Sequence, residues 1–210
     1  MKPLETVDYS ILPNINDPSD IRSLNVAELN TLAQEIRNLI IHTVASTGGH
    51  LASSLGTVEL TLAIHYVFNT PQDKLIWDVG HQAYAHKIIT GRKNRFSTLR
   101  CRGGISGFPK REESIYDSFN VGHSGTSIAA AAAFAEAEYL RGGKKKSIAV
   151  IGDGSMTTGM AFEGLNWSGD RDKGLIIILN DNEMSISPNV GAMSSYLNRV
   201  MTGDRVTRFK

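Results

Sequence analysis

Two short runs of apolar residues stand out in the C-terminal half of the chain. They cover residues 148–151 (IAVI) and 175–179 (LIIIL), and neither run alternates with polar residues. Continuous apolar runs of this length are typical of strands covered on both faces, as in a parallel sheet between helices. Between them, residues 157–168 place apolar side chains at helical spacing, and Gly169 follows as a stop signal. The pattern predicts a strand–helix–strand unit in an α/β fold with a mostly parallel sheet flanked by helices.

Polar side chains follow both predicted strands at their carboxyl ends, where ligands of open α/β sheets bind. Asp153 lies in a Gly-Asp-Gly sequence after the first strand, and Asn182 closes an Asn-Asp-Asn sequence after the second. One charged and one neutral oxygen suit Mg²⁺, which completes its shell with phosphate and water. We expect the amides at the start of the intervening helix, near Ser155, to face the same point and favour an anion. The sequence therefore predicts a divalent metal held against a diphosphate.

Other phosphate motifs do not fit the same stretch. Residues 154–159 have the glycine spacing of a P-loop, but Met160 stands where that motif needs lysine. The dinucleotide fingerprint fails as well, because Thr157 replaces its third glycine. A tight turn after a strand stays open as an explanation of Gly-Asp-Gly taken alone. The Asn-Asp-Asn sequence one crossover later favours the metal site over the turn.

The rest of the chain shows weaker but usable patterns. Asn25 and Glu28 resemble a capping box that opens a helix ending before Gly48, with Val26, Leu29, Leu32, Ala33, Ile36, Leu39 and Ile40 as its apolar stripe. The other predicted elements are an extended, proline-containing lead-in over 1–24, a buried helix over 57–68, a strand over 75–77 that runs into Asp78, a loop region over 90–120, and an alanine-rich helix from Ser124 to Ala137.

Composition and charge narrow the class of protein. The formal net charge is +1, so no basic face for nucleic acid is indicated. The single Cys101 excludes an internal disulfide framework and fits a reducing compartment. No apolar run approaches the roughly 20 residues that span a bilayer, and the N-terminus lacks a signal-peptide pattern. We expect a cytoplasmic protein that binds neither nucleic acid nor membrane.

The six histidines differ in their predicted surroundings. His42, His65 and His86 fall on predicted helices, where packing or surface roles are expected. His50 follows Gly48-Gly49 in a predicted turn. An exposed loop histidine and an acid/base group both remain open there, since imidazole exchanges protons near neutral pH.

Five blocks of the chain, taken together, resemble the 1-deoxy-D-xylulose-5-phosphate synthases, which are relatives of transketolase that use thiamine diphosphate. The resemblance runs from about residue 20 to about residue 203. The blocks are SSLGTVEL (53–60), WDVGHQAY (77–84), GFPKR (107–111), NVGHS (120–124), and GDGSMT (152–157) with NDNEMSIS (180–187). The fold that this resemblance implies is the thiamine diphosphate-binding domain of the transketolase type.

The resemblance also implies cofactors and site residues. Thiamine diphosphate and Mg²⁺ are the expected cofactors, and His50 is the expected catalytic residue, which transfers protons around the substrate. The expected cofactor contacts are His81, Gly122, His123, Ser124, Gly154, Ser155 and Asn182. The expected metal ligands are Asp153, Asn182 and the backbone carbonyl of Met184.

The implied reaction joins pyruvate, after loss of carbon dioxide, to glyceraldehyde 3-phosphate. The family uses three domains in a longer chain and is dimeric, whereas residues 25–210 match only the first domain. We therefore expect a homodimer, as in the family, and we expect this fragment to be inactive alone. Two alternatives stay open: a subunit of another thiamine diphosphate enzyme, such as a split transketolase, and a phosphate-binding remnant without turnover. The blocks at 77–84 and 180–187 favour the synthase.

Overall fold

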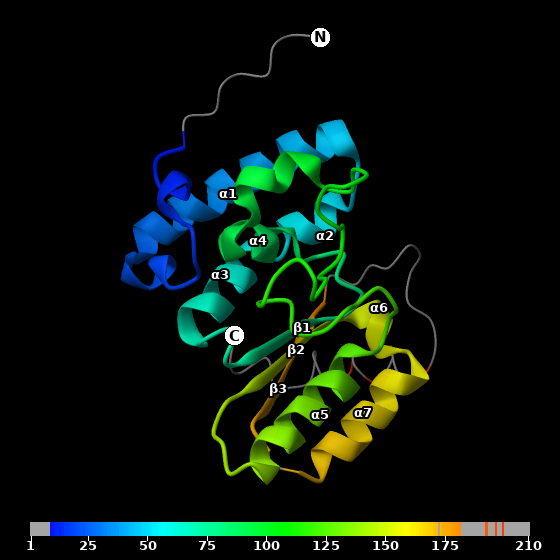
Figure 1. Ribbon diagram of the computed structural model, residues 1–210. Coiled ribbons are helices and arrows are strands. Elements are labelled where there is room, and N and C mark those ends of the chain that lie inside the picture. Colours follow the sequence, from blue (N-terminus) through cyan, green and yellow to red (C-terminus); the bar gives the residue numbers. More distant parts are fainter. Residues whose placement is uncertain (1–8, 172, 182–191, 193–195, 197–198, 200–210) are drawn as a thin grey trace. The chain divides into compact units, whose positions relative to one another are not determined.

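The computed structural model describes residues 9–171, 173–181, 192, 196 and 199 (Figure 1). The chain divides into two compact units. A helical unit comprises residues 1–73 and 80–122, and a sheet unit comprises residues 74–79 and 123–210. The chain therefore enters the sheet unit for one strand, returns to the helical unit, and enters the sheet unit again.

The sheet unit is a parallel α/β layer, as the apolar runs predict. The described strands are β1 (Lys74–Trp77), β2 (Ser147–Gly152) and β3 (Leu175–Asn180), paired in the order β1-β2-β3. Their register places Trp77 opposite Val150, and Gly152 opposite Asn180. The carboxyl ends of all three strands therefore lie at one edge of the sheet.

The helices of the sheet unit whose bounds the structure describes are α5 (Ser127–Leu140), α6 (Asp153–Met156) and α7 (Gly159–Gly169). Helix α5 lies against the sheet, mainly over β1 and β2, and α7 packs against α5. The alanine-rich sequence allows this close approach, because the small side chains of Ala131 and Ala135 on α5 are fully buried. At Gly164 of α7, a β-carbon would lie only 3.0 Å from the Ile128 side chain, so glycine is the residue that fits this contact.

Two details of the predicted strand–helix–strand unit differ in the structure. The single helix predicted over 157–168 is a one-turn helix, α6, followed by α7 from Gly159, because the Thr158 side chain caps α7 by accepting the Ala161 amide at 3.4 Å. Strand β2 is buried along nearly its whole length, whereas every residue of β3 is only half-buried. An apolar run thus predicted the strand correctly but not how far its residues are buried.

The helical unit is built around α1 (Val26–Thr47). The predicted capping box is confirmed, since Asn25 Oδ1 accepts the Glu28 amide at 3.0 Å and Glu28 Oε2 accepts the Asn25 amide at 2.8 Å. The other elements are η1 (Leu12–Asn14), η2 (Asp20–Ser23), α2 (Leu51–Leu55), α3 (Val58–Val67), α4 (Tyr84–Lys87), the π-helical turn η3 (Ile88–Arg92) and the 3-10 helix η4 (Lys93–Thr98).

The core of the helical unit confirms most of the predicted stripe on α1. Leu32, Ala33, Ile36 and Ile40 are buried, and Leu29 and Leu39 pack against them. Val26 was assigned to the stripe wrongly, because it is the first residue of the helix and is 74% exposed. The stripe begins one turn later, where α1 meets its neighbours.

Residues 9–24 are more structured than the extended lead-in that the sequence suggests. They contain η1 and η2 and contribute Leu12, Ile15 and Ile21 to the buried core. The buried Glu35 carboxylate holds the segment in place by accepting the Ser10 amide at 2.7 Å and the Leu12 amide at 2.6 Å. Burial alone would raise the pKa of Glu35, but the amide hydrogen bonds from Leu12 and Ser10 lower it overall.

The region over 90–120 was predicted to be a loop. It begins instead with the end of η3 and with η4, and becomes loop only after Thr98. This loop, residues 99–117, carries the charges described below. No helix in the part of the chain that the structure describes is both long and apolar enough to span a bilayer.

Candidate functional site

The carboxyl edge of the sheet carries the acidic residues that the sequence places at strand ends. Asp153 follows β2 directly and is 7% exposed. Because Gly152 pairs with Asn180, Asp153 lies beside the start of the Asn-Asp-Asn sequence. Asn182 and Met184, the other predicted metal ligands, lie outside the described residues. Among the residues that are described, no group of three acidic, histidine or cysteine side chains is placed to hold a metal.

The turn after Asp153 is shaped by threonine side chains. The Thr157 hydroxyl donates to the Gly154 carbonyl at 2.7 Å, and the Thr158 hydroxyl donates to the Ser155 carbonyl at 2.8 Å. Gly154 and Ser155 are half-buried and belong to the single turn α6. The sequence predicted instead that the residues near Ser155 begin the long helix, which is α7. The same two carbonyls also accept the Thr157 and Thr158 amides, at 3.4 and 3.1 Å. Each carbonyl is thus satisfied by the residue three positions on, and α6 ends after one turn.

Asp78 shapes the same edge of the sheet, and sequence reasoning assigned it no role. It follows β1, is 1% exposed, and accepts the Gly125 amide at 2.9 Å and the Ser127 amide at 3.0 Å. The carboxylate thereby holds the turn that precedes α5, where the predicted contacts His123 and Ser124 lie. An acidic residue directly after a buried strand, inside a block of family resemblance, was the available signal.

Gly125 brings the starts of α5 and α7 together. Its φ is +79°, and a β-carbon there would overlap the Thr158 hydroxyl. Both the positive φ and the contact therefore require glycine.

We expect Gly125→Ala to lower the free energy of unfolding by about 1–3 kcal/mol, through backbone strain and overlap with Thr158. Urea denaturation measures the change. Gly142→Ala is the matched control, because Gly142 also has a positive φ of +71° but open space around it. Equal losses in the two variants would show that the Thr158 contact is unimportant.

The helical unit brings two predicted residues together. The rings of His50 and His81 form an edge contact with centroids 5.6 Å apart, and the Phe108 ring lies 6.1 Å from His50. The Ser54 hydroxyl fixes the backbone at His81 by donating to its carbonyl at 3.0 Å. The Tyr84 hydroxyl accepts the His50 amide at 3.3 Å.

His50 borders a pocket of about 410 Å³ whose other lining residues all come from 100–113, among them Arg100, Ser106, Phe108 and Lys110. Partial desolvation, and then the Arg100 cation, lower the pKa of His50 below its ordinary value. The imidazole is therefore neutral at pH 7 and able to accept a proton. The pocket combines this base with two cationic side chains, Arg100 and Lys110, and one carboxylate, Glu113, which is already paired with Lys87. The remaining positive charge favours an anionic ligand.

The predicted residues thus fall into two groups. His50, His81 and Gly122 belong to the helical unit, and His123, Ser124, Asp153, Gly154 and Ser155 belong to the sheet unit.

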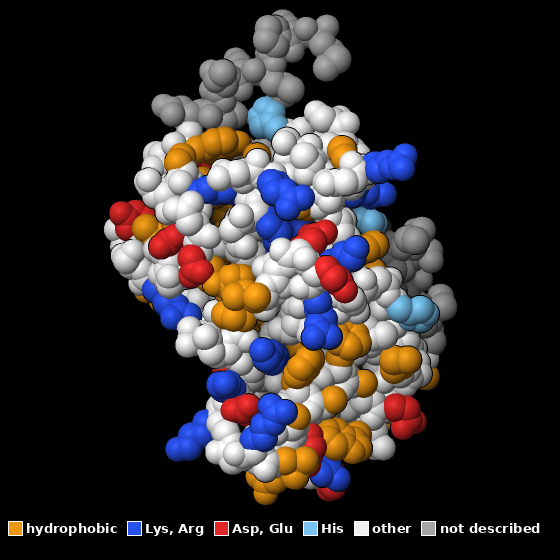
Figure 2. All heavy atoms as spheres, in the orientation of Figure 1, with side chains coloured by type: hydrophobic (Ala, Val, Ile, Leu, Met, Phe, Trp, Pro, Cys, Tyr) orange, Lys and Arg blue, Asp and Glu red, His pale blue; other side chains and the backbone are white. Residues whose placement is uncertain are grey.

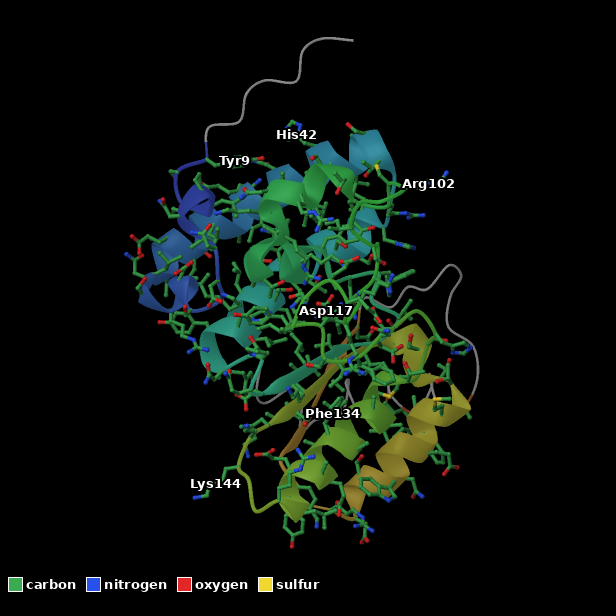
Figure 3. All side chains as sticks on the ribbon, in the orientation of Figure 1. Tyr9, His42, Arg102, Asp117, Phe134 and Lys144 are labelled. Atoms are coloured by element: carbon green, nitrogen blue, oxygen red, sulfur yellow. The ribbon has the colours of Figure 1, made fainter. Side chains whose placement is uncertain are left out.

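Sequence reasoning missed a buried polar chain in the helical unit. His65 and His86 are fully buried, and hydrogen bonds of 2.8, 2.9 and 2.9 Å link Thr70 to His65, His65 to His86, and His86 to Asp117. This series of hydrogen bonds ends at Asp117, which is labelled in Figure 3. The Asp117 carboxylate also pairs with Arg92 at 2.6 Å. Every group is satisfied when both imidazoles are neutral and donate through Nε2 towards Asp117.

Burial is the main cause of the lowered pKa of both histidines. For His65, the neighbouring charges of His86, Arg22 and Arg92 add to burial and lower its pKa well below the ordinary value. For His86, Asp117 opposes burial without overcoming it, while Arg92 and Lys87 lower the pKa further. The folded protein therefore binds fewer protons at these sites than the unfolded chain does.

Stability is accordingly expected to fall as the pH drops below about 6.5, the unfolded histidine value. Each histidine that stays unprotonated contributes a slope of at most about 1.4 kcal/mol per pH unit. Urea denaturation between about pH 7.5 and about pH 5 measures the slope. His42→Gln, on α1, should retain it. A free energy of unfolding that stays level across this range would contradict the neutral pair.

A parallel sheet with Asp153 at its carboxyl edge and helices against its face is the architecture of an α/β domain of the transketolase type. Comparison with known proteins identifies the family. The family model described as 1-deoxy-D-xylulose-5-phosphate synthase matches residues 12–210. The chain belongs to this family.

Named relatives agree. The chain is 68% identical over 200 residues to the 1-deoxy-D-xylulose-5-phosphate synthase of Syntrophus aciditrophicus, covering 95% of this chain and 31% of the relative. It is 65% identical over 201 residues to that of Syntrophotalea carbinolica, covering 96% and 32%. It is 63% identical over 201 residues to the synthase of Desulfotalea psychrophila, covering 96% of this chain and 31% of the relative. The chain thus spans about a third of the length of these relatives.

Proposed function

We propose that this chain is the diphosphate- and Mg²⁺-binding domain of a 1-deoxy-D-xylulose-5-phosphate synthase, which converts pyruvate and glyceraldehyde 3-phosphate to 1-deoxy-D-xylulose 5-phosphate for isoprenoid precursors. The observation that carries the proposal is family membership over residues 12–210 combined with a buried Asp153 at the carboxyl edge of the sheet.

The residues present fit the cofactor. Asp153 offers a hard oxygen donor where β2 ends, and Asp78 holds the backbone turn at His123 and Ser124. Asp153, Asn182 and the Met184 carbonyl would hold Mg²⁺, which prefers such oxygens. His81, Gly122, His123, Ser124, Gly154, Ser155 and Asn182 would contact thiamine diphosphate. When bound, the cofactor supplies the electron sink that decarboxylation of pyruvate requires.

The protein's own contribution is to bind, orient and move a proton. His50 would accept a proton from a hydroxyl group in the pocket and return it; its lowered pKa and its position in the pocket lining support this role. Arg100 and Lys110 line the same pocket and would attract an anionic substrate. The Phe108 ring lies beside the His50 ring, with centroids 6.1 Å apart.

Calorimetric titration with thiamine diphosphate and Mg²⁺ tests the binding function. Saturable binding that requires both components is the expected result for the whole polypeptide that carries this sequence. Residues 25–210 correspond to only one domain of the longer enzyme, so the 210-residue chain by itself should form no product from the two substrates. Product formed by the purified chain would overturn this part of the proposal.

A homodimer is also proposed, in the cytoplasm. Figure 2 shows separate groups of apolar side chains on the surface of the sheet unit. The large exposed apolar side chains of α5 and α7 are Tyr139, Leu140, Met160, Phe162 and Trp167. Exposed apolar side chains of this size, at the end of α5 and at both ends of α7, are residues that a partner subunit could cover. Sedimentation analysis that finds only monomers of the whole polypeptide would remove the dimer from the proposal.

A further inference from the structure

Buried charges attach one wall of the His50 pocket to the helical unit. The wall is formed by the loop after Thr98, and its carboxylates meet two cations from the helix that ends in η3. Lys87 Nζ lies 2.7 Å from Glu113 Oε2, and Arg92 pairs with both oxygens of Asp117 at 2.6 and 2.9 Å. The side chains of Lys87 and Asp117 are fully buried. We name Lys87, Arg92, Glu113 and Asp117 the buried charge cluster.

The same two carboxylates also hold the backbone of the pocket wall. Glu113 Oε1 accepts the Ser106 amide at 2.5 Å, and Asp117 Oδ2 accepts the Lys110 amide at 2.7 Å. Ser106 and Lys110 both line the pocket. Each carboxylate therefore bridges a cation of the helix and an amide of the wall.

The buried charge cluster uses ionic contacts where apolar packing could also have held the loop. An ion pair buried in a protein contributes little net stability relative to apolar packing, because desolvation offsets the attraction. Apolar contacts are non-directional, whereas a bidentate arginine pair and charge-assisted amide bonds define both position and orientation. A buried charge cluster thus suits a segment whose exact placement matters.

The placement of this segment affects His50 directly. The Ser106 hydroxyl accepts the Phe108 amide at 3.2 Å, and the Phe108 ring contacts the His50 ring. A shift at Ser106 would therefore move Phe108 relative to the base, and would change the solvent exposure of His50.

We propose that Glu113 and Asp117 are positioning residues, which fix the pocket wall at 104–110 against His50. The assignment of the pocket to a substrate rests on the proposed function, whereas the placement of the wall does not. Neither residue needs to touch a ligand for this role.

Hydrogen exchange tests the proposal without cofactor or substrate, so its result is independent of the proposed function. In Glu113→Ala, amides of residues 104–110 should exchange at least about tenfold faster, while amides of α1 stay unchanged. Glu113→Gln, which retains an acceptor for the Ser106 amide, should lie between the parent and Glu113→Ala. Glu112→Ala is the matched control, because the neighbouring Glu112 is exposed.

An NMR titration of His50 in the same variants separates positioning from simple loss of charge. Removing an anion lowers the pKa of a nearby imidazole, whereas release of the wall reduces the desolvation of His50 and the effect of Arg100. An upward shift of the His50 pKa in Glu113→Ala therefore supports positioning.

Three outcomes would overturn the proposal: exchange at 104–110 that matches the parent, acceleration that is equal in α1, or a downward shift of the His50 pKa. Asp117→Asn, which retains one acceptor oxygen, is a second variant and should change exchange and the His50 pKa in the same directions by a smaller amount, as Glu113→Gln does. If Asp117→Asn does not fold, the result of Glu113→Ala decides.

Discussion

Asp153→Ala should lower the affinity for thiamine diphosphate in the presence of Mg²⁺ by at least about 100-fold. Substitution of a residue that only hydrogen-bonds to a metal ligand already lowers metal affinity by about 10–100-fold, and Asp153 is a proposed ligand itself. The physical reason is the loss of the charged oxygen at the carboxyl end of β2, where water and the remaining neutral donors replace it poorly. Calorimetric titration of the whole polypeptide measures the change.

Asp170→Ala is the matched control for this experiment. Asp170 is an exposed carboxylate at the end of α7 in the same unit, and its removal should leave the affinity unchanged. A melting curve of Asp153→Ala should accompany the titration, because the replaced side chain is buried. If folded Asp153→Ala bound the cofactor as tightly as the parent, the metal site would be wrongly assigned.

Asp117→Ala should lower the free energy of unfolding by about 3–5 kcal/mol, the usual cost of removing one partner from a buried ion pair. The substitution leaves the Arg92 guanidinium, the His86 ring donor and the Lys110 amide without their acceptor. Urea denaturation near neutral pH gives the value. Glu112→Ala, an exposed carboxylate in the same loop, should stay within about 0.5 kcal/mol of the parent.

A double variant tests the cause of that loss. Combining Asp117→Ala with Arg92→Met removes the cation together with its partner, so part of the lost stability should return. A loss below about 1 kcal/mol for Asp117→Ala would mean that water solvates the exposed partners, and that the cluster is less enclosed than its geometry indicates.

Local sequence patterns predicted much of the fold. The capping box at Asn25 and Glu28 and the strand at 148–151 are each specified by neighbouring residues, and both are present. Errors arose where longer-range packing decides. Val26 matches the helical period of α1 but lies before its buried stretch, and Leu12 and Ile21 become core residues only because α1 covers them.

The candidate site was predictable to the extent that its residues follow strands or family blocks. Asp153 lies at the expected strand end, and His50 and His81 lie together. Asp78 was visible in the sequence, but the two amides that it accepts come from residues more than 45 positions later. No local pattern encodes such a pairing.

The sequence by itself determined the family, the order of the main elements and the acidic residue at the end of β2, because short-range periodicity and motif spacing carry that information. Only the tertiary structure decided that His65, His86, Arg92 and Asp117 form one buried polar network, and that its carboxylate holds the pocket wall. Asp117 is 31 residues from His86 and 25 from Arg92 in the chain. The pKa values of His65 and His86 are lowered mainly by burial, which exists only after folding.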